Sequence, residues 1–302
     1  MTTKLKARPP ETVKPGHIKG VIYGKYGSGK TFLALSFPSV YLIDSEAGAT
    51  RAHYAERLKA SNGVYLGVDD GSQDFDTIID QIKALATEDH PYKTLVIDSI
   101  TKVYNLAIAK EAERLGSKDA FGASKKPAVA QMRRLISWIS KLDMNVWLVA
   151  HEISEWGLVD GQRTEIGKTA DVYDKLLYEL DLTLQIRQHS AKRRDALVVK
   201  SRLSGFPANE AIVLQDNGID MCYDEIATRY GKDSIEADVQ PIALATNWQV
   251  ARIKTLFDAL NLTEEQISKG LAKKNAETVE DLSTEEAQTI IADIEKKLAA
   301  PN

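Results

Sequence analysis

The stretch IKGVIYGKYGSGKT, residues 18–31, decides the fold of this chain, because an apolar strand runs into a glycine-rich loop and a helix start. The loop has the pattern Gly-x-x-x-x-Gly-Lys-Thr, which in this order of elements is typical of a phosphate-binding loop. Its glycines let backbone N–H groups surround a β-phosphate, and the helix start adds the positive end of a dipole. We expect the following residues to bind a nucleoside triphosphate: Gly24, Lys25, Tyr26, Gly27, Ser28, Gly29, Lys30, Thr31 and Phe32.

Magnesium accompanies the triphosphate in sites of this kind, and two residues are candidate ligands. Within the loop, Lys30 is expected to reach the β- and γ-phosphates, and the hydroxyl of Thr31 to bind Mg²⁺. The run TLVIDS, residues 94–99, ends an apolar segment in an acid, as a central strand does at its carboxyl edge. We expect Asp98 to hold Mg²⁺ through its water shell, opposite Thr31.

Hydrolysis also needs a group that orients or deprotonates the attacking water. The run VYLIDSE, residues 40–46, ends another strand and places Glu46 just beyond it, where a γ-phosphate would project. Asp44 could equally be the base, or it could cap the turn. A single glutamate after a strand is also common on protein surfaces, so the pattern alone leaves these alternatives open.

A third apolar run, residues 146–150, ends at His151 and Glu152. A polar residue at this edge of a sheet could hydrogen-bond the γ-phosphate and relay its loss to the next loop. His151 could instead be a core histidine whose ring nitrogens are satisfied within the fold.

Composition limits the class of protein. The 302 residues suffice for one α/β domain with a small appendage, and the net charge of −4 excludes a global basic surface for nucleic acid. The only cysteine, Cys222, excludes an internal disulfide framework and is consistent with a reducing cytosol. No segment approaches the roughly 18 consecutive apolar residues of a membrane span, so we expect a cytoplasmic protein with no membrane partner.

Short apolar runs alternate with helical patterns from residue 18 to about residue 206. This alternation predicts an α/β fold with a mostly parallel central sheet flanked by helices, and sites at the carboxyl edge of the strands. The last two strands are joined by a short polar link and are expected to form an antiparallel hairpin. The expected strands are 18–23, 40–43, 64–67, 94–98, 145–150, 180–186 and 196–200.

The character of the sequence changes toward both ends. The first residues are polar and basic, and residues 232–245 lack a clear period and contain Pro241. Beyond them, capping boxes begin at Thr263 and at Ser283, as in a small helical unit. The expected parts are a flexible tail 1–16, a core 17–231, a linker 232–245 and a small helical domain 246–302.

The order of these parts resembles the RecA family of recombination ATPases, over about residues 18–206. It is most similar to the phage-encoded RecA-like proteins that act in single-strand annealing. The motif LIDSE at 42–46 and the pair Asp98-Ser99 carry the resemblance, and His151-Glu152 stands where the bacterial recombinase has Asn-Gln. The resemblance implies a RecA-like P-loop core that uses ATP and Mg²⁺, with Glu46 activating water, in the cytoplasm of a bacterial host cell.

Two later segments extend the resemblance. KLLYELDL, residues 175–182, resembles the segment that leads from the family's second DNA-binding loop into its next strand. VVKSR, residues 198–202, resembles the segment whose two cations reach the nucleotide of a neighbouring subunit. The resemblance therefore implies a homo-oligomer with nucleotide at its subunit interfaces, where Lys200 and Arg202 act in trans. From the residues alone, the same two cations could be the solvated end of an edge strand.

The two DNA-binding loops of the family would fall at about residues 116–128 and 154–172. The first is small and basic, and the second combines an aromatic residue with cations, which suits single-stranded nucleic acid because bases stack while cations follow phosphates. Both could also be insertions without a ligand. The residues expected to contact single-stranded DNA are Lys118, Lys125, Lys126, Trp156, Arg163 and Lys168.

Together these observations predict an ATPase that binds single-stranded DNA and promotes annealing or pairing in phage-type homologous recombination. A kinase in which Glu46 deprotonates a substrate hydroxyl, and a non-hydrolysing switch resembling a helicase loader, are the alternatives. The helical tail could bind a single-strand-binding protein, DNA or a neighbouring subunit. The expected catalytic residues are Lys30, Glu46, His151, Glu152, Lys200 and Arg202.

Overall fold

A single mixed sheet organises the core of the protein, in a computed structural model that describes residues 16–119, 122–173, 175–274 and 276–299. The expected tail, 1–16, lies outside the described residues except for Gly16. The described strands run in the order β10-β9-β8-β7-β1-β5-β4-β2-β3, with β6 paired to β5 alone. Neighbours from β7 to β3 are parallel, and the pairs from β7 to β10 are antiparallel. The predicted α/β class with a mostly parallel central sheet is confirmed.

The bounds of β1, β2, β3 and β4 agree with prediction to within one residue, whereas β5, β7 and β8 extend beyond their predicted ends. The predicted antiparallel hairpin is formed by β7 and β8, whereas β9 and β10 are strands that the pattern of residues did not indicate. The bounds are β1 Lys19–Gly24, β2 Val40–Asp44, β3 Val64–Leu66, β4 Thr94–Asp98, β5 Asn145–Val159, β6 Gln162–Ala170, β7 Leu182–Ser190, β8 Arg193–Ser201, β9 Ala211–Asp216 and β10 Ile219–Asp220.

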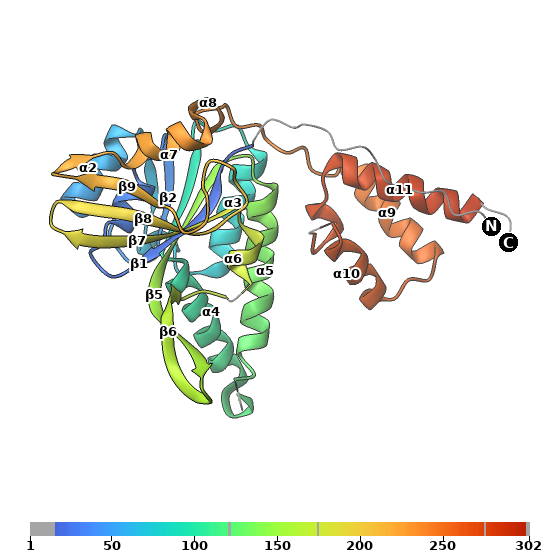
Figure 1. Ribbon diagram of the computed structural model, residues 1–302. Coiled ribbons are helices and arrows are strands. Elements are labelled where there is room, and N and C mark those ends of the chain that lie inside the picture. Colours follow the sequence, from blue (N-terminus) through green and yellow to red (C-terminus); the bar gives the residue numbers. More distant parts are fainter. Residues whose placement is uncertain (1–15, 120–121, 174, 275, 300–302) are drawn as a thin grey trace.

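Helices cover both faces of this sheet (Figure 1). Because side chains alternate along a strand, Leu95 and Ile97 of β4 join the cluster that contains α3, α4 and α5, while Val96 joins the opposite cluster with α1 and α7. The helices are α1 Lys30–Ala34, α2 Ala52–Ala60, α3 Phe75–Thr87, α4 Ile100–Leu115, α5 Lys125–Lys141, α6 Leu176–Glu179, α7 Cys222–Tyr230, α8 Lys232–Ile235, α9 Asn247–Ala259, α10 Glu264–Ala272 and α11 Thr284–Ala299, with short 3₁₀ turns η1 Val68–Asp70, η2 Gly116–Lys118 and η3 Val279–Asp281.

The segment 154–172, predicted to be a loop, is mostly a two-stranded ribbon, and that prediction was wrong. Strand β5 continues nine residues past its expected end at 150 and pairs with β6 in antiparallel register. The turn is Asp160-Gly161, whose φ angles of 52° and 78° match the tight hairpin turn that this dipeptide favours. An Asp-Gly pair between β-branched and aromatic residues was the overlooked signal.

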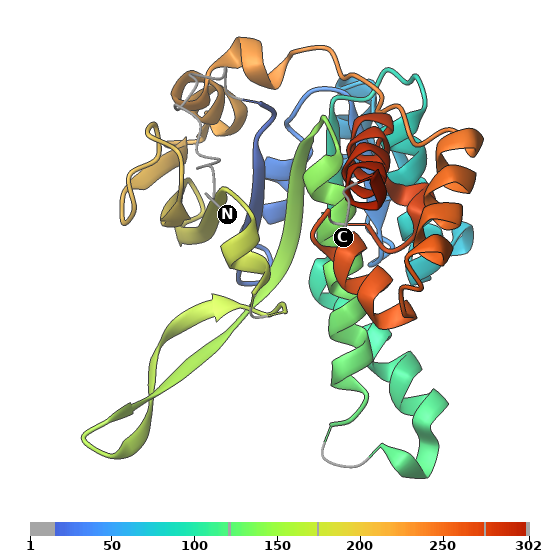
Figure 2. The same cartoon turned by 90° about the vertical axis from the view of Figure 1, so that its right-hand side faces the viewer.

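The first predicted DNA-binding loop, 116–128, also has more regular structure than expected. Its beginning is η2 and its end is the first turn of α5, while residues 120–121 lie outside the described part of the chain. Figure 2 shows that this segment and the β5–β6 ribbon project on the same side of the core. The ribbon and the α4–α5 end therefore lie on one side of the core and diverge from each other.

The C-terminal helices build a hydrophobic cluster of their own, which includes Ile253, Leu271 and Ile291. Both expected capping boxes are present, with Thr263 N donating to Gln266 Oε1 at 2.9 Å and Ser283 N donating to Glu286 Oε2 at 3.0 Å. The expected linker 232–245 is not wholly irregular, since it contains α8. No helix within the described ranges combines the length and apolar character needed to cross a membrane.

Ion pairs join these C-terminal helices to the core. Lys83 Nζ lies 2.9 Å from Asp281 Oδ1, and Arg134 Nε lies 2.9 Å from Glu277 Oε2. Lys141 Nζ adds a hydrogen bond to the carbonyl of Asp281. The helical unit thus docks on the α3 and α5 side of the core through charged groups.

The central strand β1 is packed so closely that its second residue must be glycine. Gly20 pairs with Trp147 of β5 and Leu182 of β7. A β-carbon at Gly20 would lie 2.5 Å from Cζ3 of Trp147 and 2.9 Å from the carbonyl of Leu182. Trp147 is fully buried and packs at 5.2 Å against Phe37, so its ring has little room to move.

We expect Gly20→Ala to destabilise the protein by about 2 kcal/mol, because overpacking a close-packed sheet forces backbone shifts. The measurement is the free energy of unfolding from urea denaturation followed by circular dichroism. Gly270→Ala is the control, because that exposed glycine of α10 has no atom within 4 Å of the added carbon. It should stabilise the helix by about 1 kcal/mol. Equal effects of the two variants would contradict this account.

Candidate nucleotide-binding site

The phosphate-binding loop lies between β1 and α1, at the carboxyl edge of the sheet. Gly27 and Gly29 have φ angles of 69° and 101°, a backbone conformation that side chains with a β-carbon rarely adopt. Helix α1 has only five residues, so its dipole adds less than the sequence suggested. The loop's own N–H groups and the ammonium group of Lys30 are therefore the main groups here that can attract phosphate.

The lysine of the loop lies folded across it. Lys30 Nζ donates hydrogen bonds to the carbonyls of Gly24 at 2.9 Å and Lys25 at 2.8 Å. Burial lowers the pKa of Lys30, while the carboxylates of Asp98 and Glu46 oppose that shift. The ammonium group is therefore held between the loop and the acidic side of the site. The side chain of Tyr26, in contrast, is 96% exposed and points away from the loop.

The two predicted magnesium residues lie together. Thr31 Oγ1 donates a hydrogen bond of 2.6 Å to Asp98 Oδ2. Burial raises the pKa of Asp98 to about 6, and the carboxylates of Glu46 and Asp44 add to the shift. All four side chains line one small cavity of about 90 Å³. A hydroxyl beside clustered carboxylates fits Mg²⁺, which prefers oxygen ligands and would compensate their charge.

Glu46 is held by two donors from neighbouring strands. Its Oε1 accepts hydrogen bonds from Ser99 Oγ at 2.5 Å and from His151 Nε2 at 2.7 Å. Burial alone would raise the pKa of Glu46, but the bonds from Ser99 and His151 hold it below its usual value. The carboxylate is therefore ionised and oriented. Asp44, the alternative base, instead caps the turn by accepting from the backbone N–H groups of Glu46 and Ala49.

His151 and Glu152 contact different neighbours, Glu46 and Gln185 respectively. His151 is the residue of β5 that faces Glu46, and its backbone N–H is held by Thr101 Oγ1. Glu152 accepts a hydrogen bond of 2.8 Å from Gln185 on β7. The sequence placed both near the γ-phosphate, and the structure brings only His151 to the predicted water-activating residue.

The structure does not bring Lys200 and Arg202 to the loop of their own chain. Lys200 Nζ donates to the carbonyl of Leu180, and the guanidinium of Arg202 donates to the carbonyls of Tyr178 and Glu179. Neither lines the cavities beside the loop. Any role at a nucleotide would be at that of another subunit.

The predicted DNA-contacting residues occupy the two projections. Lys118 is in η2, and Lys125 and Lys126 begin α5, where both are exposed. On the ribbon, the Arg163 guanidinium lies 5.4 Å from the centre of the Trp156 ring. Lys168 forms an ion pair of 2.5 Å with Glu165.

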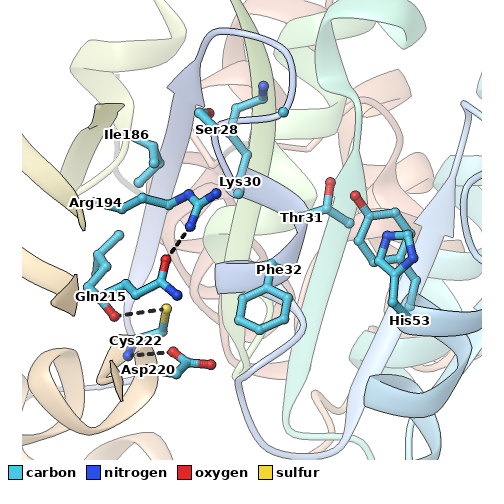
Figure 3. A pocket seen from close by; sticks show the side chains of 14 residues that line it. Ser28, Lys30, Thr31, Phe32, His53, Ile186, Arg194, Gln215, Asp220 and Cys222 are labelled. Carbon is cyan, nitrogen blue, oxygen red and sulfur yellow. Dashed lines mark hydrogen bonds between the residues drawn. The ribbon is translucent and has the colours of Figure 1, made fainter. Parts of the chain in front are cut away.

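A larger cavity of about 470 Å³ opens on the other side of α1, and the sequence analysis did not indicate most of its walls. Figure 3 shows Arg194 and Gln215 on one side of the loop and His53 on the other. In the sequence, Arg194 belongs to a basic hairpin tip, residues 192–194, typical of exposed turns. Strand β9, which carries Gln215, lies about 190 residues from the loop, so no local pattern links the two.

We expect Asp98→Asn to raise the Mg²⁺ concentration that supports half-maximal ADP binding at least about 10-fold, because a carboxylate that holds the ion's water shell is lost. The measurement is the affinity for ADP at a series of Mg²⁺ concentrations. Asp89→Asn, at an exposed position, is the control. An unchanged Mg²⁺ dependence would exclude Asp98 from the metal site.

Comparison with known proteins identifies the family of the chain. A family model described as an AAA domain, AAA_24, matches residues 17–213, which include the loop, Glu46 and Asp98. No curated protein matches the chain significantly. Among solved structures, a KaiC-like protein from the hyperthermophilic archaeon Pyrococcus horikoshii OT3 aligns with 66% of this chain and 86% of that chain. The two chains are 14% identical, and the TM-score is 0.37. The family model covers more than half of the chain, and the chain therefore belongs to the AAA domain family AAA_24, a family of P-loop nucleotide-binding proteins.

Proposed function

We propose that this protein hydrolyses ATP at the phosphate-binding loop and couples that reaction to the binding of single-stranded DNA. The observation that carries the first part is the position of Glu46. Its carboxylate is ionised, is oriented by Ser99 and His151, and lines the same small cavity as Thr31 and Asp98. This is the arrangement that a water-activating residue requires.

In the proposed reaction, water attacks the γ-phosphorus, the bond to the β–γ bridging oxygen breaks, and ADP and inorganic phosphate leave. Glu46 orients the water and accepts its proton. Lys30 exchanges the carbonyls of Gly24 and Lys25 for phosphate oxygens. Mg²⁺ bound at Thr31 and Asp98 would neutralise charge on the β- and γ-phosphates.

The coupling to DNA is proposed from the continuity of β5. The strand is buried beside β1 and β4, carries His151 against Glu46, and continues into the ribbon. Trp156 lies five residues beyond His151, about 17 Å along an extended strand. A change at Glu46 would thus reach the ribbon along a single strand, whose pairing with β6 shifts register once, between Glu155 and Trp156.

The ribbon has the chemistry of a platform for single-stranded DNA. Trp156 is 52% exposed, and the Arg163 cation lies over its ring, so a base and a phosphate could be bound side by side. We propose that annealing or pairing of DNA is the process served. In it, Lys200 and Arg202 would reach the nucleotide of a neighbouring copy, and the C-terminal helices would contact a single-strand-binding protein.

We expect Glu46→Gln to reduce ATP hydrolysis by about 100-fold or more while leaving ATP affinity nearly unchanged, because the amide cannot accept a proton. Steady-state phosphate release and equilibrium nucleotide binding measure the two quantities. Glu88→Gln, an exposed acid at the end of α3, is the control. Unchanged hydrolysis in Glu46→Gln would sink the assignment, and hydrolysis absent from the unmodified protein would favour a nucleotide switch.

Trp156→Ala should weaken binding of an oligothymidylate about 10-fold, because stacking on one base contributes about 1 to 3 kcal/mol. Fluorescence anisotropy of a labelled oligonucleotide measures this affinity. Tyr65→Ala, which removes an exposed aromatic ring from the distant edge strand β3, provides the comparison. Equal affinities for the two variants would argue against the ribbon as the DNA surface.

A further inference from the structure

Strand β8 brings one cation to the phosphate-binding loop of the same chain. Arg194 is the second residue of β8, and its Cδ and Nε lie 3.7 and 3.8 Å from the position of a β-carbon built on Gly29. Gly29 directly precedes Lys30. The stem of Arg194 therefore crosses the last glycine of the loop, on the side of α1 opposite to Thr31 (Figure 3).

The guanidinium of Arg194 is only partly satisfied within the described chain. One terminal nitrogen donates to the side chain of Gln215 on β9, and also to the carbonyl of Ala191 at 3.5 Å. Its Nε is buried and has no hydrogen-bond partner among the described residues. The hydroxyl of Ser28 in the same loop is likewise buried without a partner there. Buried donors without acceptors are costly, so both atoms indicate that the cavity takes a ligand rich in acceptors.

The position of Arg194 in the cavity indicates which part of a ligand it meets. The cavity of about 470 Å³ begins at the loop and continues to apolar walls formed by Phe32, Leu214 and Cys222. Arg194 lies between these two regions. The ammonium group of Lys30, in contrast, reaches back to the beginning of the loop, against the carbonyls of Gly24 and Lys25. The two cations can therefore bind different phosphate groups of the same polyphosphate.

We propose that Arg194 is an intrachain phosphate-binding residue, whose Nε–H donates to an oxygen of the phosphate next to the nucleoside. This inference rests on the proposed function, because it describes how the same site holds its nucleotide. Arginine suits the position because its planar fork keeps its charge and can bond Gln215 and a phosphate oxygen together. The contact is made within one chain, so it needs no assembly of subunits.

The test is calorimetric titration of the full-length protein with two probes in Mg²⁺, ADP and inorganic triphosphate. Arg194→Gln should weaken both by about 10- to 100-fold, as expected for loss of a hydrogen bond to a charged group. Arg194→Lys should give an intermediate loss, because it keeps the charge but not the fork. Arg193→Gln, at the adjacent exposed position, should leave both affinities unchanged.

The possible outcomes separate this inference from the proposed function. Wild-type affinity in Arg194→Gln, or a loss confined to ADP, would overturn the phosphate contact while hydrolysis in the unmodified protein could stand. The predicted losses in a protein without ATPase activity would support the contact and refute hydrolysis. An unmodified protein that binds neither probe would overturn both. If Arg194→Gln has a lowered melting temperature, the affinities of Arg194→Lys and the unmodified protein are compared at a temperature where both are folded. Wild-type affinity of Arg194→Lys for both probes would then overturn the contact, and the predicted intermediate loss would support it.

Discussion

The parallel register of four adjacent strands is the constraint on which the rest of the structure depends. In that register Gly24 of β1 pairs with His151 of β5, and Asp44 of β2 pairs with Asp98 of β4. The ends of these strands therefore meet at one edge, although they are separated by up to about 130 residues in sequence. A shift of one residue in any pair would turn the side chains of that strand to the opposite face of the sheet and separate the polar ends. Close packing at Gly20 and Trp147 helps to prevent such a shift.

The meeting of these strand ends places three carboxylates in a small space, and each has a different degree of burial and different hydrogen-bond donors. Asp98 is buried with a single hydroxyl donor, so its pKa is raised. Glu46 receives two side-chain donors and stays ionised, while Asp44 is used by the backbone. Three carboxylates in one small space thus differ in state: one is buried with a raised pKa, one is ionised and oriented, and one caps a turn. Burial and hydrogen-bond partners together separate the three carboxylates.

The loop is approached from several sides by elements that are distant in sequence. β5 carries His151 toward Glu46 and then leaves the core as the ribbon, while β8 and β9 bring Arg194 and Gln215 to the larger cavity beside the loop. A triphosphate in the loop would lie between these two groups of residues. In the proposed coupling, β5 would connect the site to the ribbon, because the strand is buried in the sheet and mostly exposed beyond it.

The sequence by itself determined the phosphate-binding loop, the polar residues at the ends of the parallel strands and the capping of the C-terminal helices. Each of these depends on residues that are close in the chain. Glycine spacing, an acid after an apolar run and a capping box are local patterns. The Asp160-Gly161 turn was also local, and the ribbon could have been predicted from it. Only the tertiary structure decided that Glu46 is held by Ser99 and His151, that Asp44 caps a turn, and that Arg194 lies on Gly29. The cap at Asp44 is local, and the structure decided it against the base role that the sequence left open. The contacts of Glu46 and Arg194 join segments far apart in the sequence, and their geometry depends on register and packing, which no short stretch of sequence contains.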